Sequence, residues 1–153
     1  MRESLEPLSE DEANTLHCWL RAFEIQRINE GSASLPPDPW YLHGLLPSET
    51  PEQERDNFAH AFHEILRDLV AEDGYVHFVD EQHVYARFYP HRKVTLAFDD
   101  IVLDGETAAY VAQDRDWGLV SIGWTYPSPM AFFGEPIVSR LRQRHPPLLK
   151  RLL

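Results

Sequence analysis

The amino-acid sequence predicts a single α+β domain over residues 1–153, in which an antiparallel meander of about five or six strands has helices packed on one face. Three observations predict this class. Apolar residues recur at helical spacing in much of residues 1–73, the period changes to two in residues 74–134, and residues 135–153 return to a helical pattern. With 153 residues, of which 43% are apolar, the chain is long enough to bury one core.

The first helix is predicted from a capping signal followed by one apolar stripe. Ser9 and Glu12 have the spacing of a capping box, in which the hydroxyl accepts a hydrogen bond from an amide at the helix start. Residues 29–32 (NEGS) should end this helix. The stripe follows at i, i+3, i+4 and i+7, and consists of Leu16, Trp19, Leu20 and Phe23.

The connection that follows is rich in proline, at positions 36, 37, 39, 47 and 51, yet it also carries Trp40 and several leucines. Plain loops of this length are uncommon, and this one is too apolar to be fully solvated. We therefore expect an ordered segment over the core, in which Asp38 and Pro39 could begin one short helix.

The second helix is the clearest prediction from the sequence. Thr50, Pro51 and Gln53 should start it as cap, first-turn proline and capping-box partner, and Gly74 is suited to end it. Its apolar residues fall on a single face, and they are Phe58, Phe62, Ile65, Leu66 and Leu69.

Strands are predicted where the apolar residues alternate, and the segments between them are short and turn-like. Asp99 and Asp100 read as a hairpin turn, and Asp104 with Gly105 has strong two-residue hairpin chemistry. Short connections require antiparallel neighbours, which is why we expect a meander. The predicted strands are residues 75–79, 83–89, 93–98, 101–103, 107–112 and 119–124.

The last segment combines a proline-containing loop at residues 126–129, an apolar patch at residues 130–133 and a helix that starts near Pro136. The helix should end at residues 145–147 (HPP). Its buried side is predicted to consist of Ile137, Val138 and Leu141.

Charge is distributed unevenly along the chain. The net charge is −11 in residues 1–73, −4 in residues 74–134 and +4 in residues 135–153, which together give −11. Such a field attracts cationic surfaces and repels nucleic acid and anionic membranes. The candidate contacts for a cationic protein partner are acidic residues on or just beyond the second helix, provided that the basic C-terminal segment does not neutralise them: Asp56, Glu64, Asp68, Glu72 and Asp73.

A second candidate surface lies on the sheet. Alternation places His77 of one strand, and alternate residues of the next, on the face opposite the aliphatic residues. This face is either a binding surface or an ordinary solvated one, since tyrosine also favours strands. Its candidate anchors are His77, Tyr85, Arg87 and Tyr89, and an enzyme or small-ligand site for a carboxylate or phosphate would use His77, His83, Tyr85, Arg87 and His91.

The sequence carries no strong metal or nucleophile motif. His60, His63 and Glu64 share one side of the second helix, but they point away from its apolar stripe and should face solvent. His17 and Cys18 are neighbours on a helix, so their side chains diverge. We therefore expect no metal, no cofactor and no catalytic residue. A single cysteine, an acidic N-terminus and no long apolar run point to a cytoplasmic protein.

Three short motifs resemble a family of small, uncharacterised bacterial proteins of unknown function. They are residues 80–91 (DEQHVYARFYPH), residues 110–118 (YVAQDRDWG) and residues 133–135 (FGE). The resemblance covers the C-terminal half and implies a bacterial α+β domain, with no catalytic residue to transfer. Similar small acidic bacterial proteins serve as immunity partners of toxins. We therefore expect a non-enzymatic immunity or inhibitor-type protein, with a small enzyme or a homo-oligomer such as a homodimer as alternatives.

Overall fold

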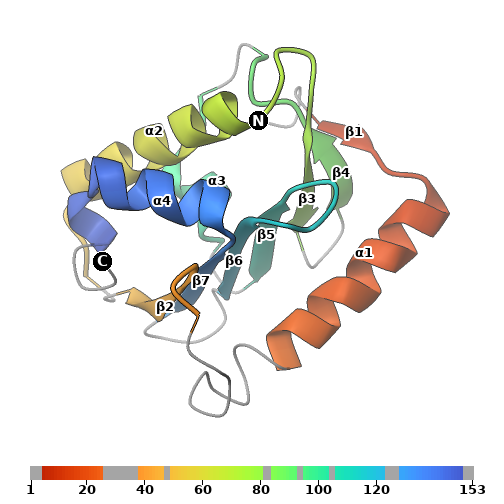
Figure 1. The fold of residues 1–153 in the computed structure, drawn as a ribbon, viewed down its shortest axis with the longest axis horizontal. Coiled ribbons are helices and arrows are strands. Elements are labelled where there is room, and N and C mark those ends of the chain that lie inside the picture. The colour runs from red at the N-terminus through yellow and green to blue at the C-terminus, as the bar shows by residue number, and fades with distance from the viewer. Residues whose placement is uncertain are drawn as a thin grey trace.

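The computed structural model describes residues 5–25, 38–46, 49–80, 84–92, 95–103, 106–122 and 128–149. Within these ranges, seven strands form one antiparallel sheet with the order β1-β4-β3-β5-β6-β7-β2 (Figure 1). The α+β class and the antiparallel pairing are confirmed, and the sheet is slightly larger than expected. The strands are β1 (Leu5–Pro7), β2 (Tyr41–Leu46), β3 (Val76–Asp80), β4 (Val84–Phe88), β5 (Thr107–Val111), β6 (Gly118–Ile122) and β7 (Ser128–Phe133).

Helices from both ends of the chain pack against this sheet, as Figure 1 shows. They are α1 (Glu10–Phe23), α2 (Glu52–Leu69), α3 (Phe98–Ile101) and α4 (Glu135–Arg144), and α4 is followed by a short 3-10 segment, η4 (Pro147–Leu149). Among the residues that the structure describes, none of the helices combines the length and the apolar character needed to cross a lipid bilayer.

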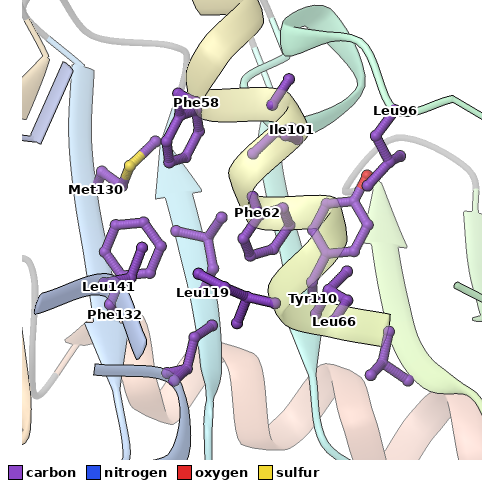
Figure 2. Packing of buried hydrophobic residues seen from close by; sticks show 14 of the residues in the cluster. Phe58, Phe62, Leu66, Leu96, Ile101, Tyr110, Leu119, Met130, Phe132 and Leu141 are labelled. Carbon is purple, nitrogen blue, oxygen red and sulfur yellow. The ribbon is translucent and has the colours of Figure 1, made fainter. Parts of the chain in front are cut away.

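The helices divide between the two faces of the sheet, whereas we expected them on one. The larger cluster of buried residues joins one face to α2, α3 and α4 (Figure 2), and it includes Phe62, Phe78 and Tyr110. The smaller cluster joins the opposite face to α1, through Leu16 against Val79 and their neighbours. Because successive strand residues point to opposite faces, the central strands are buried on both sides.

Within the segment from β3 to β7, the strand order departs from a simple meander at one place. Strands β3 and β4 pair as a hairpin, but β5 pairs with β3 and not with β4. The chain therefore passes from β4 across to the far side of β3 before it enters β5, and α3 lies in this crossing. From β5 onward the strands β5, β6 and β7 do follow one another as neighbours.

Two strands were predicted at residues 93–98 and 101–103, and their described parts, residues 95–98 and 101–103, are not strands, while residues 93 and 94 lie outside the described residues. Residues 98–101 form α3 instead, and Asp99 and Asp100 lie in its first turn and not in a hairpin. The Asp100 carboxylate accepts a hydrogen bond from the Ala97 backbone N–H at 2.9 Å. The Ile101 side chain is fully buried, and Ser121 donates a hydrogen bond to the Ile101 carbonyl at 2.9 Å. These tertiary contacts stabilise a helical turn that the local alternation does not favour.

Three strands were not predicted. Strand β1 adds to β4 at one edge, and β2 forms the other edge beside β7. The short helix expected at Asp38 and Pro39 is wrong, because the Asp38 carboxylate accepts a hydrogen bond from the Trp40 N–H at 2.9 Å and turns the chain into β2. The apolar patch at residues 130–133 is part of β7, which lies between β6 and β2.

The helix ends follow the predictions only in part. The Ser9 hydroxyl accepts from the Glu12 N–H at 3.2 Å, so the cap of α1 is confirmed. In α2 the N-cap is Pro51, which makes no side-chain hydrogen bond, so the predicted N-cap at Thr50 is one residue too early. Extended backbone at Val70 ends α2, four residues before Gly74. The expected end of α1 at residues 29–32 lies outside the described residues.

Candidate functional site

Two of the five acidic candidates on and after α2 are held by the C-terminal helix. Arg144 of α4 forms an ion pair with Glu64 and lies 3.9 Å from the Asp68 carboxylate. The hydrogen bond from Arg144 is also the largest cause that lowers the pKa of Glu64. Asp56, by contrast, is exposed on α2 and forms no ion pair within the described part of the chain.

Glu72 and Asp73 lie in the turn between α2 and β3. Both side chains are exposed, and neither forms an ion pair with any residue that the structure describes. The acidic surface predicted from the sequence is therefore divided, with part of it neutralised inside the chain and part of it available to a partner.

The histidines around α2 have structural roles. His63, which we expected to face solvent, is 5% exposed, and its Nε2 lies 2.9 Å from the Pro90 carbonyl oxygen. Burial lowers the pKa of His63. The Nε2 atom of His91 lies 2.8 Å from the Val70 carbonyl oxygen, so both rings join the connection after β4 to the end of α2. His60 remains exposed and contacts Glu64 at 2.7 Å.

Helix α1 packs on the tyrosine and arginine face of the sheet, and β1 lies at the edge beside β4. The His17 ring Nδ1 lies 2.6 Å from the Tyr85 hydroxyl, and Arg87 contacts the Glu12 carboxylate at 3.3 Å. At the edge of the sheet, the Tyr89 hydroxyl donates a hydrogen bond to Glu6 at 2.9 Å. Contacts within the chain therefore occupy the polar ends of these side chains.

The four described residues of the enzyme alternative do not all meet in one site. His77 is buried on the α1 side of the sheet, where its Nδ1 has no hydrogen-bond partner among the described residues, and burial lowers its pKa. His91 contacts the end of α2, which packs on the opposite side. His83 lies outside the described residues. Within the described ranges, no group of three His, Cys, Asp or Glu side chains is placed to hold a metal ion.

A pocket of about 460 Å³ lies beside α1, where four separate segments of the chain meet. We call it the α1 pocket. Helix α1 supplies one wall, the residues before β2 a second, the turn between β5 and β6 a third, and the junction of β7 with α4 the fourth. Its lining residues are Trp19, Ala22, Phe23, Asp38, Trp40, Arg115, Asp116, Phe133, Gly134 and Glu135.

Aromatic rings form the walls of the α1 pocket. The ring centroids of Trp19 and Phe23 are 5.2 Å apart, and each of these rings lies 5.0–5.6 Å from that of Phe133. Trp40 is 37% exposed, and its carbonyl oxygen accepts a hydrogen bond from the Gly134 N–H at 2.8 Å. This bond ties Trp40 to the start of α4.

The charged groups around the pocket are mostly carboxylates. Asp38, Asp116 and Glu135 are exposed, and none of them forms an ion pair with another described residue. Arg115 is the one cationic side chain among the described lining residues, and its Nε is buried without a hydrogen-bond partner. Three carboxylates against one guanidinium leave the lining with a net charge of −2.

Gly134 brings the last two walls together. Its φ angle is +96°, a conformation that favours glycine, and its α-carbon packs directly on the backbone of Asp116 and Trp117. This close approach places Glu135, at the start of α4, beside the turn that carries Asp116.

Comparison of the chain with protein-family models, with curated proteins and with solved structures found no match. The family resemblance of the three short motifs stays a prediction.

The sequence did not reveal the α1 pocket, because its lining residues lie in four segments between positions 19 and 135. A possible signal was the exposed tryptophan in the proline-rich connection together with the turn at residues 114–118 (DRDWG). Two of the resembling motifs, residues 110–118 and 133–135, each supply pocket residues.

Proposed function

We propose that this chain is a non-enzymatic acidic binding protein whose partner is a cationic protein. The observation that carries the proposal is the α1 pocket, in which aromatic walls are combined with three carboxylates that form no ion pair with a described residue, in a chain of net charge −11. Aromatic side chains provide binding area, and carboxylates outside ion pairs are available to cations.

The charge of the whole chain supports the same proposal. The ion pairs that Arg144 makes with Glu64 and Asp68 lower the number of carboxylates available on α2, but they leave the net charge at −11. A field of this sign speeds the encounter with a basic surface and disfavours nucleic acid and anionic membranes. We therefore assign the principal contact to the α1 pocket, with Glu72 and Asp73 as secondary contacts.

Within this class we propose an immunity or inhibitor-type protein that neutralises a basic toxin in the cytoplasm. The lone cysteine, Cys18, is exposed and not in a disulfide, which suits a reducing compartment. A carboxylate or phosphate site on the sheet is less well supported, because Arg87 already contacts Glu12 and an anion would have to displace that carboxylate. Self-association, including a homodimer, stays a prediction that sedimentation would test.

The experiment is a pull-down from the source cell with the immobilised full-length chain, eluted by a salt gradient. We expect a basic protein that elutes as the salt concentration rises, because screening weakens its attraction to the acidic chain. The captured protein is then purified, and its activity or toxicity is measured with and without an equimolar amount of the chain. Loss of that activity supports an inhibitor. Capture of no basic protein, or capture that salt does not weaken, contradicts the proposal, and binding without inhibition contradicts its immunity part.

A further inference from the structure

We propose that the α1 pocket is the recognition site for one arginine side chain of the partner. This inference rests on the proposed function, since the arginine belongs to the cationic protein. It names the chemical group that the pocket takes, a planar guanidinium.

The size of the pocket fits one side chain. Small-molecule pockets span about 300–1,000 Å³, and about 460 Å³ is in the lower part of that range. The space suits one extended side chain with its terminal group and not an element of secondary structure. The lining comes from four segments that the fold holds together, partly by the hydrogen bond from the Gly134 N–H to the Trp40 carbonyl oxygen.

The aromatic walls suit a guanidinium in particular. A guanidinium is flat, weakly hydrated and able to stack on aromatic faces, while an ammonium group is compact and strongly hydrated. The chain already contains this interaction at the edge of the pocket, since the Arg142 guanidinium lies 5.4 Å from the centre of the Trp40 ring. Arg142 is not among the described residues that line the pocket, but it adds a positive charge beside them. Trp19 does line the pocket and is the second tryptophan that an incoming arginine would contact.

The carboxylates favour a cation, and their oxygens can accept hydrogen bonds from the N–H groups of a guanidinium. Asp116 and Glu135 are exposed, have no ion-pair partner in the described ranges and come from the two walls that Gly134 brings together. The Asp38 carboxylate already accepts the Trp40 N–H, so we assign it a smaller role. Arg115 repels a cation, but three carboxylates outnumber it in the described lining. Guanidinium groups bind carboxylates through paired hydrogen bonds, so exposed carboxylates beside the pocket favour arginine binding.

The test uses the full-length chain and four small probes: N-acetyl-arginine methylamide and its citrulline, lysine and glutamate counterparts. Citrulline is the decisive comparison, because it has the shape of arginine without the charge. Binding is followed through the indole N–H signals of the tryptophans in NMR spectra, with Trp19 and Trp40 assigned by substitution. We expect the arginine probe to shift these two signals in a saturable way, and the citrulline probe to bind at least about tenfold more weakly.

The pocket variant combines Asp116→Asn with Glu135→Gln, and its matched control combines Asp99→Asn with Glu52→Gln. Each pair removes two negative charges from exposed side chains, and the control residues lie on α3 and α2, which pack on the opposite face of the sheet. We expect the pocket variant to lose about tenfold or more in affinity for the arginine probe, and the control to stay within about twofold. A thermal unfolding scan of both variants establishes that they fold. A second pocket variant, Trp19→Leu, leaves the charge unchanged and should also weaken binding of the arginine probe.

Four outcomes would overturn the inference: no saturable shift with the arginine probe, equal binding of citrulline, tighter binding of lysine, or a preference for glutamate, which would assign an anion to Arg115. The captured partner separates this inference from the proposed function. If the pocket variant binds the partner as tightly as the unmodified chain, while a Glu72→Gln, Asp73→Asn variant loses binding, then the proposed function holds and the pocket is not its contact. If no basic partner binds the unmodified chain, the proposed function itself fails.

Discussion

Replacement of Gly134 by alanine is expected to destabilise the fold strongly. At φ +96° and ψ 137° an added β-carbon is strained by the backbone conformation itself, which costs about 1–3 kcal/mol. That β-carbon would also lie 2.6 Å from the Trp117 β-carbon and 2.7 Å from its α-carbon, and it would press still more closely on the Asp116 carbonyl oxygen. These atoms belong to the backbone or are attached directly to it. The junction between β7 and α4 must therefore move to relieve the overlap, at a further cost of about 1–3 kcal/mol.

We expect a loss of about 3 kcal/mol in the free energy of unfolding, measured by urea denaturation followed through tryptophan fluorescence. With a urea dependence of about 2 kcal/mol per molar, the midpoint should fall by about 1.5 M. Gly74→Ala is the matched control, because Gly74 has no positive φ and the nearest atom to an added β-carbon is a methyl group of Val70 at 2.8 Å. A side-chain terminus can move, so the control should lose less than about 1 kcal/mol. The reasoning is refuted if Gly134→Ala costs no more than its control.

Two further predictions concern the core and its pH dependence. Tyr110→Phe should lower the free energy of unfolding by about 1–2 kcal/mol in urea titrations, because the fully buried hydroxyl donates a 2.6 Å hydrogen bond to the Asp100 carbonyl; an unchanged midpoint would contradict this. Burial lowers the pKa of His43, His63 and His77, so below pH 6.5 the unfolded chain takes up protons that the folded chain does not, and stability should fall between pH 7 and pH 5. Unfolding curves at the two pH values should show a smaller loss of unfolding free energy for His63→Gln than for the unmodified chain. An equal loss in the two proteins would show that His63 does not contribute to the pH dependence.

Local sequence signals predicted several elements correctly. The Ser9 cap and the stripe from Leu16 to Phe23 lie within α1, and the alternation at residues 107–112 corresponds to β5. These signals succeed because capping and periodicity involve groups that are neighbours along the chain. The prediction at residues 98–101 failed because Ile101 is buried by contacts with distant parts of the chain, which override the local preference for a strand.

What the sequence by itself determined about this protein is its class, its two long helices, most of its central strands and its acidic charge. Only the tertiary structure decided that α1 covers the opposite face from α2, that β2 lies beside β7, and that Arg144 contacts Glu64. The α1 pocket belongs to the second group as well, since Trp19, Trp40 and Glu135 meet only after the sheet has formed. The physical reason is that strand order and the choice of face depend on pairing and burial between distant segments, and apolar patterns are compatible with more than one such arrangement.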